Sequence, residues 1–333
     1  MKFGPTPIED AEGAVLAHGV RIDGVAFKKG DTVTRDRRLA LTRAGVTSVV
    51  AARLEAGDVG EDEAALKLAK RLAGANLRCS PPFTGRVNLF AETAGLAIID
   101  AEAIDRVNAV DEAITVATLP HCRAVADGDM VATVKIIPFA TESSTLEATL
   151  AAAPTSAIAV QPFKPMRIGV VSTTLPGLKP STIAKTLRIL EARLTPAQAR
   201  IVAQEIVPHE IGPLAKALAR LIDGADALIV FGASAITDRR DVIPAAIEAI
   251  GGRIERFGMP VDPGNLLLLA ERYGIPIIGA PGCARSPKEN GFDWVLRRVL
   301  AGAPIHDKDI RAMGVGGLLM EIASRPQPRA PGE

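Results

Sequence analysis

The chain has 333 residues, of which 48% are hydrophobic, 23% are charged and only 3% are aromatic, and its formal net charge is +1. This length can form two domains with separate cores, and the balance of residues is ordinary for a soluble globular protein. The near-neutral charge, and the lack of a basic cluster with stacking aromatics, argue against a nucleic-acid partner.

The sequence also argues against a membrane protein. The N-terminal residues lack the apolar core of a signal peptide, and no later run reaches the ~20 apolar residues that span a bilayer. We therefore expect a cytoplasmic protein. Cys79, Cys122 and Cys283 are far apart and show no metal-ligand spacing, so two of them are expected to be buried thiols.

The first part of the chain mixes short strands with helices. One or two extended runs at 13–22 precede a helical pattern at 35–44 and a strand at 47–54. A second helix is predicted at 64–73, after an acidic first turn that suits a helix N-terminus. These elements predict a small α+β unit that ends near residue 76.

The same α+β pattern continues to about residue 162. It contains a predicted helix at 101–108, a strand at 113–118 and a β-branched strand at 130–137. Alanine-rich and proline-containing segments between 146 and 165 resemble a linker. We therefore predict an N-terminal α+β region over 1–163, either as one unit or as two units split near 76, and a second domain over 164–333.

The second half alternates strands and helices. Strands are expected at 167–172, 201–207, 227–231 and 275–280, and helices at 181–194, 211–222, 242–250 and 292–300. Such alternation predicts a three-layer α/β/α domain, in which helices cover both faces of a mostly parallel sheet. The loops after the strands then meet at one edge of the sheet, where such domains bind ligands.

The loop after the third strand of this series is the strongest candidate for a ligand site. It opens with Gly232, Ala233 and Ser234, which are small enough for a ligand to approach the backbone, and amides at a helix start favour an anion. Asp238 and Asp241 add carboxylates that would hold a cation, orient a donor-rich ring or move a proton. The structural alternative is that Asp241 only caps the following helix and Asp238 is a solvated turn residue.

Three further loops are expected at the same edge of the sheet. Their candidate ligand-binding residues are Thr173, Thr174, Asp262, Gly264, Gly282, Arg285 and Ser286. Arg285 and Ser286 form the best phosphate site, because Gly282 lets a ligand approach the backbone and the loop precedes a helix. The alternative is a Gly/Pro turn with solvated basic residues.

Other motifs give weaker signals. Cys283 would be reactive only if a helix start or Arg285 lowered its pKa, and an inert thiol is the simpler expectation. His209 precedes a predicted helix, where a single histidine is more often a cap or a surface residue than a catalytic group. The glycines at 314–317 do not complete a dinucleotide fingerprint, and a Walker A motif is absent from the sequence.

The second half resembles the molybdopterin-binding domain of the MoaB/Mog and molybdopterin molybdenumtransferase type, found in molybdenum-cofactor biosynthesis. The resemblance covers about residues 166–302. It is carried by the order and spacing of the loop 232–241, Gly251 and Gly252, the run 258–264, and Pro281 and Gly282 with Ser286. The region 13–65 resembles, more loosely, N-terminal segments of proteins with this domain. The closest resemblance is to bacterial proteins that also carry a nucleotidyltransferase domain.

The resemblance implies a homo-oligomer that binds molybdopterin, with Mg²⁺ or molybdate as possible further requirements. Arg285 and Ser286 would take the phosphate of the ligand, and Asp238 or Asp241 would accept from the pterin. Three features depart from the family pattern. Phe231 replaces the first glycine of a Gly-Gly pair. The run 281–286 differs from the family's Pro-Gly-Asn-Pro-x-Ser loop. The Met-Asp-Gly-Tyr-Ala element of the molybdenumtransferases is approached only by residues 22–26.

Three hypotheses follow for the function. The first is a binding module that holds molybdopterin or its molybdenum form and hands it to a separate nucleotidyltransferase, which the linker-like run 324–329 favours. The second is a molybdenumtransferase-like enzyme in which Asp238 and Asp241 take part in catalysis. The third is a different small-molecule enzyme or nucleotide binder on the same scaffold, since a fold does not determine a function.

Overall fold

The structure is a computed structural model that describes residues 1–22 and 25–319. The motif-like run 22–26 therefore lies partly, and the linker-like run 324–329 wholly, outside the described residues. The chain divides into two compact units between Gln161 and Pro162.

The first unit contains two separate cores. The N-terminal one is built on a three-stranded antiparallel sheet of the order β1-β5-β2, and its buried residues include Leu16 and Leu41. The elements of this part are β1 (Lys2–Pro7), β2 (Val15–Leu16), β3 (Val20–Ile22), β4 (Val25–Phe27), α1 (Arg35–Arg43) and β5 (Ser48–Arg53). Helix α1 begins where the Thr34 side chain accepts a hydrogen bond from the Arg37 N–H, as a helix cap does.

The second core of this unit lies between helices and a four-stranded antiparallel sheet of the order β10-β12-β8-β7. Its strands are β6 (Asp58–Gly60), β7 (Leu77–Cys79), β8 (Arg86–Ala91), β9 (Gly95–Ile99), β10 (Ile114–Thr118), β11 (Arg123–Val125), β12 (Met130–Ile136), β13 (Ala140–Glu142) and β14 (Ile158–Pro162). Its helices are α2 (Glu61–Leu72), α3 (Ala101–Asn108) and α4 (Ser143–Ala152). Strands β11, β9 and β14 form a further small sheet, and β13 pairs with β6.

The second unit has a six-stranded sheet of the order β16-β15-β17-β20-β19-β18. Its strands are β15 (Arg167–Thr174), β16 (Arg200–Pro208), β17 (Ala227–Phe231), β18 (Arg253–Phe257), β19 (Leu268–Arg272) and β20 (Ile275–Ala280). Its helices are α5 (Pro180–Leu194), α6 (Ile211–Leu221), α7 (Val242–Ala249), α8 (Gly291–Ala301) and α9 (Asp307–Arg311). Strands β15, β16, β17 and β20 run parallel, whereas β19 is antiparallel to both of its neighbours.

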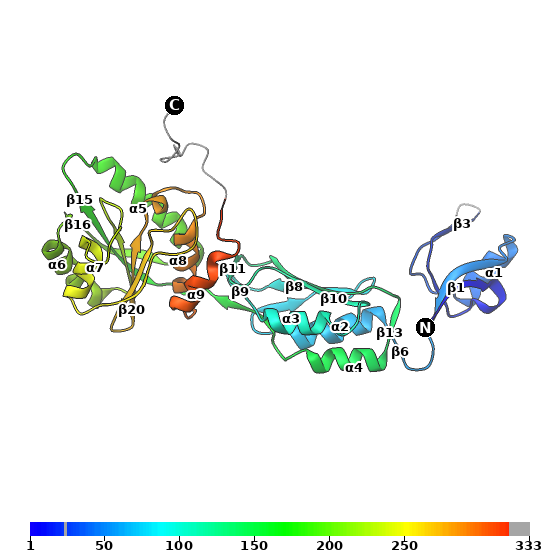
Figure 1. The fold of residues 1–333 in the computed structure, drawn as a ribbon. Helices are drawn as coiled ribbons and strands as arrows, with labels where there is room; N and C mark the ends of the chain where they lie inside the picture. Colours follow the sequence, from blue (N-terminus) through cyan, green and yellow to red (C-terminus); the bar gives the residue numbers. More distant parts are fainter. Residues whose placement is uncertain (23–24, 320–333) are drawn as a thin grey trace, which may run out of the picture. The chain divides into compact units, whose positions relative to one another are not determined.

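Helices cover both faces of this sheet (Figure 1). Side chains of β17 alternate between the two cores: Ile229 and Phe231 pack with α5 and α8, and Leu228 and Val230 pack with α6 and α7. All five residues of β17 are buried, which explains why the strand has no polar alternation. The predicted three-layer α/β fold with a mostly parallel sheet is confirmed. The sequence interpretation did not include β19.

The order of the strands creates a crevice beside β15. The chain passes from β15 to β16 on one side and then to β17 on the other side. Helix α5, which follows β15, packs on one face, and α7, which follows β17, packs on the opposite face. The chain therefore leaves the carboxyl ends of β15 and β17 toward opposite faces of the sheet. Such a position is called a topological switch point, and α/β domains bind ligands there.

Candidate functional site

Thr173 and Ala233 join the two loops at this switch point. Thr173 lies near the end of β15 with no exposed surface, and its Oγ1 accepts a hydrogen bond of 2.8 Å from the Ala233 N–H. Gly232 has no space for a side chain, because an added Cβ would lie 2.7 Å from the Ser234 carbonyl oxygen. Ser234 is exposed at the surface of the loop. The structure thus brings Thr173, Gly232, Ala233 and Ser234 together, as the sequence predicts.

Arg285 reaches the same place from the loop after β20. It lies in a 3-10 turn, Gly282–Arg285, and donates hydrogen bonds of 2.9 Å to the Thr186 hydroxyl and to the Gly232 carbonyl oxygen. Its guanidinium lies 5.5 Å from the centre of the Phe231 ring. Burial lowers the pKa of Arg285 below its usual value, and no carboxylate among the described residues forms an ion pair with it. A half-buried cation held only by neutral groups is suited to bind an anion.

A cavity of about 420 Å³ lies beside Arg285, at the start of α5. It is lined by Ser181, Thr182, Lys185, Thr186, Arg188 and Arg285. The lining contains three hydroxyl groups and three cations but no carboxylate. This combination can bind a phosphate. Ser181, Thr182 and Thr186 were not predicted from the sequence, because their proximity to Arg285 depends on the packing of α5.

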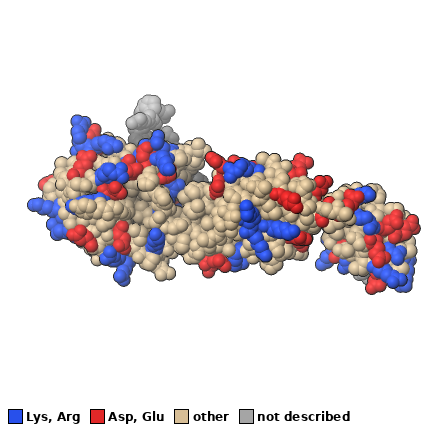
Figure 2. Space-filling model, turned by 90° about the horizontal axis from the view of Figure 1, so that it is seen from below, with Lys and Arg blue, Asp and Glu red and all other residues tan. Residues whose placement is uncertain are grey.

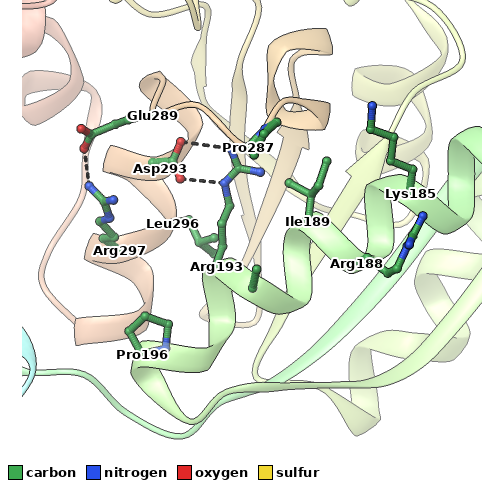
Figure 3. Close-up of a pocket in the computed structure, with 11 residues that line it drawn as sticks. Lys185, Arg188, Ile189, Arg193, Pro196, Pro287, Glu289, Asp293, Leu296 and Arg297 are labelled. Carbon is green, nitrogen blue, oxygen red and sulfur yellow. Dashed lines mark hydrogen bonds and ion pairs between the residues drawn. The ribbon is translucent and has the colours of Figure 1, made fainter.

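The loop between β20 and α8 is held in place by Arg193 of α5 (Figure 3). The Arg193 guanidinium donates to the carbonyl oxygens of Ala284 and Ser286 at 2.7 Å each, and it pairs with the Asp293 carboxylate at 2.6 Å. The side chains of Arg193 and Asp293 are only 10% and 7% exposed. The carboxylate of Asp293 also accepts from the Asn290 N–H, within a capping box at the start of α8.

The sequence interpretation missed Arg193, Asn290 and Asp293. Asn290 and Asp293 have the three-residue spacing of a capping box, which is a signal that the sequence does contain. Arg193 gives no such signal, because it is 100 residues from Asp293 along the chain. These three residues fix the backbone of the loop that carries Arg285.

A larger cavity, of about 630 Å³, lies between α5 and α8 and is drawn in Figure 3. It shares Lys185 and Arg188 with the smaller cavity, and its wall also includes the apolar residues Ile189 and Leu296. Arg297 pairs there with Glu289. On the face of the molecule drawn in Figure 2, side chains of both charge signs are interspersed. Among the described residues, Lys185, Arg188 and Arg285 form no ion pair with a carboxylate.

The two candidate catalytic carboxylates have local partners. Asp238 pairs with Arg240 at 2.8 Å, and the hydrogen bonds from Arg240 lower the pKa of Asp238 to about 2. Asp241 caps α7, where its carboxylate accepts from the Val242 N–H at 2.8 Å and from the Thr237 N–H at 3.3 Å. Both carboxylates therefore accept hydrogen bonds from neighbouring groups of the loop after β17. A catalytic role for either one stays a prediction.

The remaining predicted residues lie in different surroundings. Thr174 donates to the Val207 carbonyl oxygen, and the Ser286 hydroxyl oxygen accepts from the Lys288 N–H. Gly282 is exposed, with nothing within 4 Å of an added Cβ, so its backbone is open to a ligand. Gly264 is buried against the start of α8 instead, because an added Cβ would lie 2.9 Å from the Gly291 backbone.

Asp262 and the three cysteines complete the description. The Asp262 N–H donates to the Gly317 carbonyl oxygen, and the Asp262 carbonyl oxygen accepts from the Leu319 N–H. No described contact brings Asp262 to Arg285. Cys79, Cys122 and Cys283 are all partly exposed, so the expectation that two of them are buried thiols was wrong. None of the helices in the described part of the chain has the length and apolar content needed to cross a membrane.

The fold and the site define an α/β domain with a crevice at the carboxyl edge of its sheet, beside which Arg285 lies without a carboxylate partner among the described residues. Residues 170–302 match the family model of a probable molybdopterin binding domain, and this part of the chain is a domain of that family. The resemblance noted in the sequence is therefore confirmed for this domain. Residues 5–53 match the model of a domain of unknown function (DUF8806). No curated protein matched the chain.

The solved structures that are similar to this chain include proteins of molybdopterin biosynthesis. A MoeA protein from Pyrococcus horikoshii is 14% identical, with 90% of this chain and 75% of that chain covered and a TM-score of 0.31. A MoaB enzyme from Thermus thermophilus is 17% identical, with 42% and 98% covered and a TM-score of 0.29. A molybdenum cofactor biosynthesis protein from Pyrococcus furiosus is 12% identical, with 91% and 66% covered and a TM-score of 0.27.

Proposed function

We propose that this protein binds molybdopterin or its molybdenum form at the carboxyl edge of the second-unit sheet and hands it to a nucleotidyltransferase. The observation that carries the proposal is Arg285, a half-buried cation without a carboxylate partner among the described residues, at the β15/β17 switch point. It lies within the region that matches the probable molybdopterin binding domain. In this proposal the phosphate of the ligand binds between Arg285 and the first turn of α5.

The pterin would lie over the loop after β17. This loop offers the exposed Ser234 and the carboxylate of Asp238, whose low pKa keeps it an acceptor at neutral pH. Pterin nitrogens are donors that such an acceptor would orient. Gly282 would let the ligand approach the backbone of the opposite loop.

Binding and hand-over are favoured over metal insertion by the local partners of the two aspartates. Asp238 is tied to Arg240 and Asp241 caps α7, so both carboxylates have structural roles that do not need turnover. If the protein is instead a molybdenumtransferase-like enzyme, then molybdate and Mg²⁺ become its further requirements. In that case Asp238→Asn would reduce turnover without reducing binding. Unchanged turnover in the Asp238→Asn/Asp241→Asn variant would exclude a catalytic role for the pair.

The test is a titration of the purified protein with molybdopterin, followed by pterin fluorescence. We expect saturable binding that is weakened by Arg285→Ala and retained by Arg220→Ala, a control on α6 whose guanidinium pairs with Glu205. Absence of binding by the wild-type protein would refute the proposal. Capture of a nucleotidyltransferase by the loaded protein, and not by the empty one, would support the hand-over.

We also propose that the protein is cytoplasmic and forms an oligomer. Sedimentation of the purified chain with and without molybdopterin measures the oligomeric state and its dependence on the ligand. A monomer under both conditions would remove the oligomer from the proposal and leave the binding site intact.

A further inference from the structure

His209 contacts the ligand crevice from the edge strand of the sheet. It directly follows β16, and its N–H donates to the Thr174 carbonyl oxygen at 2.9 Å. The Nδ1 atom of its ring lies 2.8 Å from the Thr173 hydroxyl oxygen. That same oxygen accepts from the Ala233 N–H. Three strands of the sheet are thus linked at their carboxyl ends by one chain of hydrogen bonds.

The donor and acceptor capacity of a hydroxyl group shows which atom donates in each of these hydrogen bonds. A threonine hydroxyl has one hydrogen to donate and two lone pairs with which to accept. The Ala233 N–H uses one lone pair of Thr173, and the hydroxyl hydrogen needs an acceptor because Thr173 has no exposed surface. Nδ1 of His209 is that acceptor when the ring carries its hydrogen on Nε2, and we assign this tautomer, in which the Thr173 hydroxyl donates to His209 and accepts from Ala233. All three groups are then satisfied.

The sequence predicts that His209 is a cap or a surface residue. The residue that precedes α6 is Glu210, so His209 is not its cap, and His209 is partly exposed. No carboxylate of the described residues lies within the 4.0 Å of an ion pair to its ring, and Glu210 is exposed without an ion pair. The contact of the ring with Thr173 is therefore the interaction that defines its position.

We propose that His209 is a positioning residue of the crevice, which acts through Thr173 on the loop after β17. Without an acceptor at Nδ1, the Thr173 hydroxyl turns to another partner and its hydrogen bond to Ala233 weakens. Arg285 is affected in turn, because it donates to the carbonyl oxygen of Gly232, the residue before Ala233. The effect on the loop is a property of the protein alone. The effect on the ligand rests on the proposed function.

The experiment measures hydrogen exchange of alanine amides by NMR, with ¹⁵N-alanine in the full chain and without ligand. His209→Asn keeps a side-chain acceptor, and His209→Leu removes it while retaining bulk. We expect His209→Leu to lower the protection of the Ala233 amide about 10-fold, the effect of one lost hydrogen bond, and His209→Asn to remain near wild type. Glu210→Gln is the control and is expected to behave as the wild type.

Ala227 and Ala280 provide internal references in β17 and β20. Unchanged protection at both positions shows that His209→Leu leaves the sheet folded, so that a loss at Ala233 is local. Equal protection of Ala233 in wild type and His209→Leu would overturn the proposal. The same holds if His209→Asn loses as much protection as His209→Leu, because shape alone would then explain the effect.

The second readout is the dissociation constant for molybdopterin. We expect His209→Leu to weaken binding several-fold and His209→Asn to restore it. If Ala233 responds as expected but the wild-type protein does not bind molybdopterin, the proposed function fails while the positioning role of His209 stands. If molybdopterin binds equally to all variants, the positioning role does not extend to the ligand and that half of the proposal is overturned.

Discussion

Arg285 and Phe231 lie against each other where two strands end. The Arg285 guanidinium is 5.5 Å from the centre of the Phe231 ring, and it donates to the carbonyl oxygen of the next residue, Gly232. The ring covers one side of the guanidinium and keeps water from it, which strengthens its attraction for an anion on the open side.

The first prediction concerns the charge of Arg285. Replacing Arg285 with alanine is expected to weaken molybdopterin binding roughly 10- to 100-fold, the value of hydrogen bonds to a charged group. Arg285→Lys keeps the charge but loses the two-pronged donor geometry, so an intermediate loss is expected. Fluorescence titration of both variants measures the change. Equal affinity of wild type and Arg285→Ala would place the phosphate elsewhere.

The second prediction concerns the pair of Arg193 and Asp293. Arg193→Ala leaves a buried carboxylate without its partner, which costs about 3–5 kcal/mol of the free energy of unfolding. Urea unfolding followed by the fluorescence of Trp294, the single tryptophan of the chain, measures this loss. Arg297→Ala is the matched control.

The control differs from Arg193 in exposure. The Arg297 and Glu289 side chains are 32% and 36% exposed, so the loss of their ion pair is expected to cost less than about 1 kcal/mol. Equal destabilisation by the two substitutions would show that the buried pair does not hold the loop that carries Arg285.

The third prediction concerns the protonation of Asp238. Hydrogen bonds from Arg240 lower the pKa of Asp238 from 3.8 to about 2. A carboxyl group whose pKa is lower in the folded than in the unfolded protein stabilises the fold at pH values above the unfolded pKa. For Asp238 this contribution is lost as the pH falls from about 4 to about 2. NMR titration of the side-chain carboxyl carbon should give a midpoint near 2 in the wild type. In Arg240→Ala the midpoint should rise toward 3.8, and an unchanged midpoint would rule out the pairing.

The fourth prediction compares two glycines in neighbouring loops. Gly264 has a φ of +148°, and an added Cβ would lie 2.9 Å from the backbone of Gly291. Gly264→Ala is therefore expected to lower the free energy of unfolding by about 1–3 kcal/mol through overpacking. Gly282 has open space around it, so Gly282→Ala should unfold as the wild type does and reduce only ligand binding. Urea unfolding and the molybdopterin titration together measure both effects.

The α/β layering of the second unit and the loops at the edge of its sheet follow from local patterns in the sequence. Apolar runs such as 227–231, followed by helical spacing, are local patterns, and the geometry of a parallel sheet then brings the following loops to one edge. The positions of Thr173, Ala233 and Arg285 at the ends of these strands predict that they are neighbours. The structure brings all three to the same crevice.

The side chains that hold these loops, and the cation that lacks a carboxylate partner among the described residues, depend on how distant parts of the chain pack together. Arg193 meets Asp293, and His209 meets Thr173, across 100 and 36 residues of sequence. Such contacts leave no local signal, because they depend on how a helix or an edge strand packs against the sheet. The same packing buries Arg285 away from the carboxylates of the described residues, and this is the physical reason for proposing it as the binding cation of the crevice.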